Sequence, residues 1–217
     1  MDYLADPIAI EAESFRRIRQ ALSEMGIDES CSRTTEEWQI VLRVVHSLGW
    51  AHLAQHLCFS EGATAAGLEA LKNKATILCD VEMVRHGLTQ RYCESETLCF
   101  LRDVPLQTEG EKVKTSRTMR AVDHWYEHLL GSIVLIGNAP TALFRLLEIL
   151  QAGGPKPALV IAMPVGFVGA TESKQALWQQ YQELNLECIT LLGPLGGSAV
   201  TAAACNALLR CLRGIYV

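Results

Sequence analysis

Short apolar runs that alternate with stretches of helical spacing are the feature that most limits how this chain can fold. The five runs cover residues 75–79, 97–101, 132–136, 158–163 and 187–192. Helical spacing is found at residues 81–86, 113–130, 139–150, 172–184 and 198–212. Strands that are apolar on both faces need helices on both faces of their sheet. The alternation therefore predicts an α/β fold with an open, doubly wound parallel sheet of about five strands.

The first seventy residues have a different pattern, which is mostly helical. Asp6-Pro7 places an N-cap residue before a proline at the first helical position. A second helix is predicted to begin at Thr34, which forms a capping box with Glu37. We expect these helices to add a layer to the sheet. Because no linker or repeat is visible, residues 1–217 are expected to form a single domain.

The charge and hydropathy of the chain argue against two classes of partner. The formal net charge is −5, which disfavours bulk attraction to nucleic acid or to an anionic membrane. The longest apolar runs have the length of strands and fall short of the ~18 residues of a membrane span. The N-terminus lacks a basic segment followed by an apolar one. We therefore expect a cytoplasmic protein that binds neither nucleic acid nor membranes.

Cysteine and histidine spacing gives no support for a metal site. None of the eight cysteines forms a C-x-x-C pair, and most lie in apolar runs, so they are interpreted as small buried hydrophobic residues. The pairs His52/His56 and His124/His128 have the i, i+4 spacing of metal ligands. Neither pair has an adjacent glutamate or a third ligand, and a solvated helix face accounts for both. No metal site is predicted.

Glycine-rich turns follow three of the predicted strands, at residues 136–141, 163–170 and 192–198. Ligands of open α/β sheets bind at the carboxyl ends of the strands, and helix N-termini there favour anions. Any one turn is interpreted as an ordinary connection, with Asn138 as the predicted N-cap of its helix. Together the turns favour a binding edge for a ligand with several acidic groups. The known phosphate-binding glycine patterns are absent, which weakens a nucleotide hypothesis.

Two further features carry potential chemistry. His46 follows an apolar helical stretch, where a lone histidine is usually a satisfied core residue. Its other interpretation is a partly buried proton donor whose pKa lies near the working pH. Residues 112–120 form a basic stretch that is either a solvated helix start or an arginine clamp for carboxylates.

Several long blocks, in order along the chain, resemble precorrin-8X methylmutases. They read GNAPTAL at 137–143, PVGFVGA at 164–170 followed by ESK at 172–174, and GGSA at 196–199. ILCD at 77–80 and the stretches 6–18 and 43–46 also fit, so the resemblance covers nearly the whole chain.

The resemblance implies a parallel α/β fold and a homodimer with its ligand near the subunit interface. The implied reaction moves the C-11 methyl of precorrin-8X, or of cobalt-precorrin-8, to C-12 to give hydrogenobyrinate, or cobyrinate, without an external cofactor. His46 would be the general acid of this isomerase of cobalamin biosynthesis. The implied substrate-binding residues are Ser14, Gly87, Thr89, Arg117, Asn138, Gly166, Gly169, Gly197 and Ser198.

Some alternatives remain open at this point. Arg120 is the fallback for Arg117, because the residues before that helix depart from the usual family pattern. Ser14 and Thr89 could equally be helix or turn caps. A non-catalytic protein that binds a tetrapyrrole would use the same pocket without an acid at His46. A nucleotide-dependent enzyme on the same fold is a third hypothesis.

Overall fold

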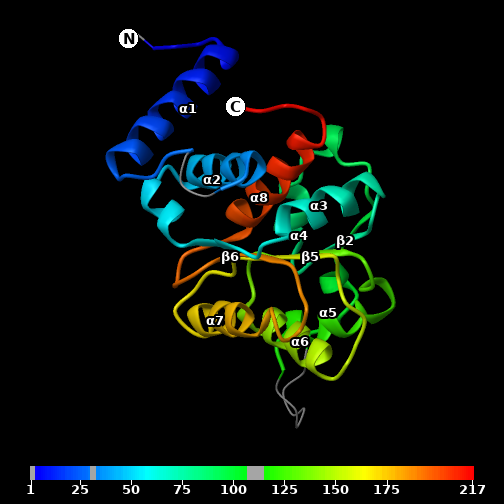
Figure 1. Ribbon diagram of the computed structural model, residues 1–217. Coiled ribbons are helices and arrows are strands. Elements are labelled where there is room, and N and C mark those ends of the chain that lie inside the picture. Colours follow the sequence, from blue (N-terminus) through cyan, green and yellow to red (C-terminus); the bar gives the residue numbers. More distant parts are fainter. Residues whose placement is uncertain (1–2, 30–32, 107–114) are drawn as a thin grey trace.

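A six-stranded sheet forms the middle of the protein in the computed structural model, which describes residues 3–29, 33–106 and 115–217 (Figure 1). Its strands lie in the order β1-β6-β5-β4-β2-β3. The pairs among β2 to β6 are parallel, whereas β1 pairs with β6 in the antiparallel sense. The strands are β1 Leu57–Phe59, β2 Ile77–Cys79, β3 Thr97–Leu98, β4 Ile133–Ile136, β5 Leu159–Ala162 and β6 Cys188–Leu191.

The predicted parallel α/β sheet is confirmed, with one strand more than expected. The missed strand is β1, whose Leu57 lies opposite Leu191 at the end of β6. It is only three residues long and lies in a region predicted to be helical. Three residues are too few to show a periodicity, so pairing with β6, which is distant in the sequence, determines this edge strand.

Helices cover both faces of the sheet in two layers (Figure 1). One layer holds α1 Pro7–Glu24, α2 Thr35–Leu48, α3 Ala63–Lys72, α4 Glu82–Gly87 and α8 Ser198–Cys211. The other holds α5 Arg117–Asp123, α6 Pro140–Gln151 and α7 Ala170–Gln180. Short 3₁₀ turns are η1 Ala51–Gln55, η2 Gln90–Tyr92, η3 Phe100–Arg102 and η4 Tyr126–His128. The expected helical layer of the N-terminal region is therefore present.

The four central strands, β2, β4, β5 and β6, contribute to two hydrophobic cores because successive side chains point to opposite faces. On β4, Ile133 and Leu135 pack into the core that contains α2 and α8, and Val134 and Ile136 pack into the core that contains α6 and α7. All four are fully buried. The first core is the larger, and within it α8 packs mainly against α2.

The two predicted helix starts are confirmed by their caps. The Asp6 carboxylate accepts hydrogen bonds from the backbone N–H groups of Ile8 and Ala9. Thr34 and Glu37 form the reciprocal capping box, with distances of 3.2 and 3.1 Å. The N-terminal end of α1 projects beyond the body of the protein (Figure 1).

The long helix predicted at residues 113–130 is wrong in extent. Residues 113 and 114 lie outside the described residues, and α5 begins at Arg117 after the N-cap Ser116, whose Oγ accepts a hydrogen bond from the Met119 N–H. The α-helix ends at Asp123, and a 3₁₀ turn follows. Buried Trp125 and Leu129 fix that turn against the second core, so packing overrides helical spacing here.

Candidate functional site

His46 lies in the last turn of α2, on the face that points away from the core. Its imidazole stacks on the Phe15 ring of α1, with ring centroids 5.0 Å apart and planes inclined by 22°. The prediction of a partly buried histidine is wrong for the single chain, in which His46 is exposed. Its neighbours Val44 and Val45 take the buried positions of the helix. The imidazole is therefore open to a ligand at the protein surface.

Arg43 contacts the same Phe15 ring as this imidazole, and Arg210 lies beside Arg43; no sequence pattern marked either arginine as a site residue. The Arg43 guanidinium lies 5.1 Å from the centroid of the Phe15 ring. Arg43 and Arg210 of α8 are 3.3 and 3.8 Å from the same carboxylate oxygen of Glu11. Burial, followed by the charge of Arg210, lowers the pKa of Arg43. We call His46, Phe15, Arg43, Arg210 and Glu11 the His46 cluster.

Gly87 and Thr89 are tied to α8 one turn before Arg210. The Asn206 side chain accepts a hydrogen bond from the Thr89 N–H and donates one to the Gly87 carbonyl oxygen, each at 2.8 Å. A Cβ on Gly87 would lie 2.7 Å from the Cβ of Ala202, so only glycine fits against α8 here. Ser14 is half-buried on α1 beside Phe15. The structure thus places Ser14 next to Phe15, and it fixes Gly87 and Thr89 against α8, the helix that packs on α2.

The turns after β5 and β6 are joined at the carboxyl edge of the sheet. The Gly166 N–H donates to the Pro194 carbonyl at 3.3 Å, and the Gly197 N–H donates to the Met163 carbonyl at 2.8 Å. Gly197 precedes buried Ser198, the first residue of α8. Gly169 adopts φ +80° as the N-cap of α7. The sheet edge predicted from the glycine turns is therefore formed, and α8 leads from it toward the His46 cluster.

A buried lysine is hydrogen-bonded to one of these turns. Lys174 of α7 is fully buried, and its Nζ donates a hydrogen bond of 2.5 Å to the Leu195 carbonyl oxygen in the turn after β6. Burial lowers the pKa of Lys174 to about 8. The lysine in the ESK block thus holds the glycine-rich turn, a role that the sequence alone did not indicate.

Asp80 holds the turn between β4 and α6, and α6 itself has no side-chain cap. The buried Asp80 carboxylate accepts hydrogen bonds from the backbone N–H groups of Gly137, Asn138 and Ala139 at 3.0, 2.8 and 2.9 Å. Burial raises the pKa of Asp80, and these N–H groups oppose the shift. The predicted N-cap role of Asn138 is wrong, because the N-cap residue of α6 is Ala139 and the helix has no side-chain cap. The exposed Asn138 remains a predicted binding residue only.

Arg117 lies in the other helical layer, on α5. Its Nε donates to the Val104 carbonyl at 2.7 Å, and Arg120 donates from Nη2 to the Pro105 carbonyl at the same distance. The Ser116 and Thr141 hydroxyls, 2.6 Å apart, join the start of α5 to the start of α6, just after β4. Arg117 is therefore near the carboxyl edge, but α5 and α2 lie on opposite sides of the sheet (Figure 1). Lys112 and Lys114 of the basic stretch lie outside the described residues.

The four histidines of the two pairs are exposed at the surface, and the described cysteines are half-buried or buried. His124 and His128 both stack on the Phe100 ring, with centroids 5.8 and 5.5 Å apart, and His52 stacks on Trp50. Within the described ranges, no three His, Cys, Asp or Glu side chains are grouped to hold a metal ion. The described cysteines are free thiols, and four of them are buried as expected: Cys79, Cys188, Cys205 and Cys211.

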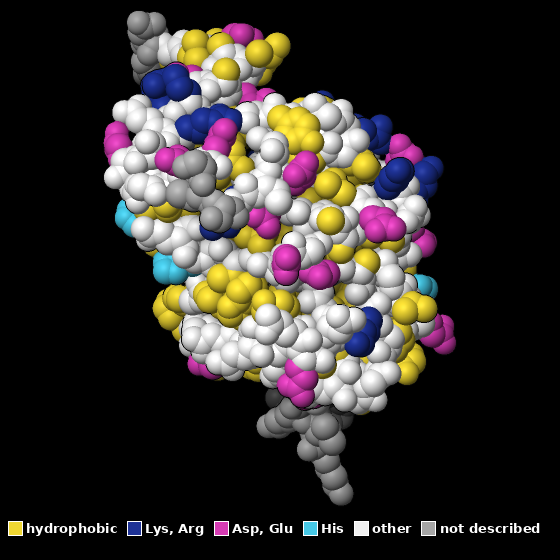
Figure 2. Space-filling view, viewed as in Figure 1, with side chains coloured by type: hydrophobic (Ala, Val, Ile, Leu, Met, Phe, Trp, Pro, Cys, Tyr) yellow, Lys and Arg dark blue, Asp and Glu magenta, His cyan; other side chains and the backbone are white. Residues whose placement is uncertain are grey.

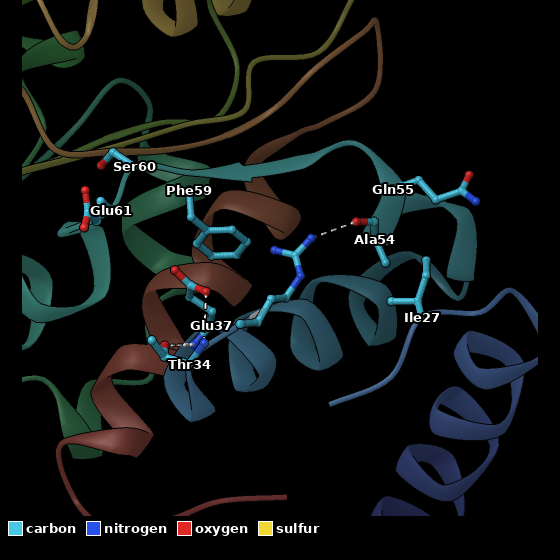
Figure 3. A pocket seen from close by; sticks show the side chains of 9 residues that line it. Ile27, Thr34, Glu37, Ala54, Gln55, Phe59, Ser60 and Glu61 are labelled. Atoms are coloured by element: carbon cyan, nitrogen blue, oxygen red, sulfur yellow. Dashed lines mark hydrogen bonds between the residues drawn. The ribbon is translucent and has the colours of Figure 1, made fainter. Parts of the chain in front are cut away.

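A cavity of about 730 Å³ lies at the opposite end of α2 (Figure 3). Arg33 lines it, with its guanidinium 5.0 Å from the centroid of the Phe59 ring and a hydrogen bond from Nη2 to the Ala54 carbonyl oxygen. Glu37 and Glu61 also line it. Its described lining contains none of the predicted site residues, so we do not assign the binding site to this cavity.

Comparisons with known proteins agree with this architecture. The family model for precorrin-8X methylmutase matches residues 9–211. The precorrin-8X methylmutase of Pseudomonas aeruginosa is 42% identical over 210 residues, which cover 96% of this chain and 97% of that protein. The cobalt-precorrin-8 methylmutase of Salmonella typhimurium is 35% identical over 219 residues, or 98% and 99% of the two chains. A precorrin-8X methylmutase structure from Thermus thermophilus is 36% identical, with a TM-score of 0.79. The match covers 95% of this chain and 98% of that one.

The fold and these likenesses define an isomerase of the methylmutase class, an enzyme that transfers a methyl group within one molecule. The agreement extends over the sheet, both helical layers and the predicted blocks of sequence. The chain belongs to the precorrin-8X methylmutase family.

Proposed function

We propose that this chain moves the C-11 methyl group of precorrin-8X, or of its cobalt-containing counterpart, to C-12 in cobalamin biosynthesis. Relatives named for the metal-free substrate and for the cobalt substrate both match over nearly their full length. A methyl shift around a conjugated macrocycle needs neither a nucleophile nor a redox partner. It needs the ring to be held in one geometry while a proton is supplied, and both tasks suit the described site.

His46 is the proposed general acid. The observation that carries this role is the exposed imidazole, stacked on Phe15 at 5.0 Å at the surface where α1, α2 and α8 meet. An exposed ring nitrogen can reach a flat macrocycle that lies against the surface. The stacking contact holds the imidazole plane in a defined orientation, which a proton transfer requires.

The macrocycle's carboxylate arms give the remaining predicted residues a role. The backbone N–H groups at the start of α8, next to Gly197 and Ser198, form a positive helix terminus. Gly166 and Gly169 allow the turn after β5 to approach a ligand closely. We propose that these groups, with Ser14, Gly87, Thr89, Asn138 and Arg117, contact the substrate.

We also propose a homodimer that works in the cytoplasm. Tyr3, Leu4, Ile8 and Ile10 are 42 to 78% exposed on and before the projecting end of α1, where Figure 2 shows hydrophobic side chains gathered. An apolar end of this kind is covered most simply by a second copy of the chain. A reducing compartment would preserve the free thiols of the described cysteines. In the described part of the chain, no helix has both the length and the apolarity to cross a bilayer.

An anaerobic incubation of the purified protein tests the proposed reaction. Precorrin-8X and cobalt-precorrin-8 are supplied in separate reactions, and the visible spectrum is followed for the product chromophore. We expect conversion of at least one substrate. If the protein binds both substrates and converts neither, it is instead a tetrapyrrole carrier. Tight binding of a common nucleotide, tested in parallel, would favour a nucleotide-dependent enzyme.

A further inference from the structure

The charges around Arg43 and Arg210 do not balance. Their side chains are only 12 and 17% exposed, and they share one carboxylate, that of Glu11. Arg145 shows the opposite arrangement, in which one guanidinium has two carboxylates. The more exposed Arg145 binds both Asp123 and Glu148, at 2.7 and 2.8 Å. Cations held away from water are normally paired individually, so among the described residues the two guanidiniums lack a second anion within salt-bridge distance.

Glu11 holds this pair only loosely. A single oxygen approaches both guanidiniums, at 3.3 and 3.8 Å, and the second distance is too long for a hydrogen bond. The Glu11 side chain is itself 45% exposed. An exposed carboxylate with one weak contact to each partner is easily replaced by another carboxylate that can bind a guanidinium with both oxygens.

The pair also lies beside the proposed site. Arg43 and His46 contact the same Phe15 ring, and Arg210 follows Asn206, which holds Thr89, by one helical turn. Arg210 and Arg91 approach the Tyr92 ring, at 5.4 and 4.7 Å from its centroid. A third guanidinium is therefore close by, in a protein whose formal net charge is −5.

We propose that Arg43 and Arg210 form a subsite for a carboxylate arm of the substrate, and that Glu11 occupies this subsite until the substrate displaces it. The inference rests on the proposed function, because it names the part of that substrate which binds here. Arg43 and Arg210 are positioning residues that anchor the ring while His46 acts on it. Glu11 is a competitor for the substrate and lowers its affinity.

Four variants test the proposal in the full-length protein. Arg43→Gln and Arg210→Gln should each raise KM about tenfold with little change in kcat, because an anchoring charge acts before the proton transfer. Glu11→Gln should lower KM severalfold, because the competing charge is gone. Arg43→Lys should restore part of the loss, since it keeps the charge without the planar fork.

Two control variants and one ligand comparison distinguish this role from a structural one. Glu13→Gln lies on the same helix but contacts Arg16 and Arg17, and Arg213→Gln removes an arginine that binds Glu94. Both should leave KM unchanged. Hydrogenobyrinic acid should bind more tightly than its fully amidated form to the wild-type protein, and this preference should shrink in Arg43→Gln and Arg210→Gln.

The outcomes separate this inference from the function on which it rests. If the wild-type protein neither converts the substrate nor binds the product, the proposed function fails. If the wild-type protein is active but Glu11→Gln raises KM or lowers the melting temperature without tightening binding, Glu11 is a tether between α1 and α8. That result, or an unchanged preference for the acid form in both arginine variants, overturns the subsite.

Discussion

Lys174 shows how one buried charge supports a site that it does not enter. Its ammonium group is fully buried and donates to the Leu195 carbonyl, so it holds the turn after β6 in place. Burial lowers the pKa of Lys174 from 10.5 to about 8. In the unfolded chain water restores the ordinary pKa, so between pH 8 and 10.5 the unfolded chain binds more protons at this residue. Lys174 therefore increases the free energy of unfolding as the pH rises from about 8 to 10.5.

Substitution of Lys174 by methionine should remove this dependence. Below about pH 8 the wild-type protein bears the full cost of a buried charge, and the cost disappears as the lysine loses its proton. We expect the stability of the wild-type protein, relative to Lys174→Met, to rise by about 1 kcal/mol per pH unit between about pH 8 and pH 10. Urea unfolding at several pH values measures this difference, and the cysteines titrate equally in both proteins. Parallel pH profiles for the two proteins would contradict the assignment.

At the scale of the element, the turn between β6 and α8 depends on glycine at one position more than at another. A Cβ on Gly196 would lie 2.1 Å from the Met163 carbonyl oxygen, whereas a Cβ on Gly193 would meet no atom within 4 Å. Both glycines have positive φ, of +155° and +89°. An alanine at Gly193 would meet only backbone strain, whereas an alanine at Gly196 would meet backbone strain and a steric clash.

Gly196→Ala should destabilise the protein by about 3 kcal/mol, because the turn after β6 must move away from the turn after β5. Gly193→Ala should cost about 1 kcal/mol, from the unfavourable φ alone. Thermal unfolding of both variants compares them directly. Equal losses would show that close contact between the two turns does not determine this geometry.

Sequence patterns predicted the helices and strands much better than the contacts between them. The apolar runs located β2 to β6, and the predicted helix at 198–212 matches α8 Ser198–Cys211 closely. Strand β1 was missed because long-range pairing, rather than periodicity, forms it. The hydrogen bonds from the turn after β4 to Asp80, and the proximity of Arg43 to Arg210, were missed for a related reason. Each joins residues that are far apart in the sequence, and no local pattern records that proximity.

At the scale of the whole molecule, the projecting end of α1 should mediate dimerisation. Ile8 is 78% exposed, so Ile8→Asp should leave the fold of the single chain intact while placing a charge in the proposed interface. We expect the wild-type protein to sediment at twice the 23.9 kDa of the chain and Ile8→Asp to shift toward the single-chain mass. Ser23→Asp, exposed on the same helix, is the control. A monomeric wild-type protein, or an Ile8→Asp variant as dimeric as the wild type, would exclude this interface.

The central claim is that the exposed imidazole of His46 supplies a proton to a ring held against α1, α2 and α8. The most direct test measures two quantities for His46→Ala, the turnover of precorrin-8X and the affinity for hydrogenobyrinic acid. The account predicts that turnover falls at least about 100-fold, as expected for loss of a general acid, while product affinity stays within about threefold of the wild type. Wild-type turnover in His46→Ala would contradict it.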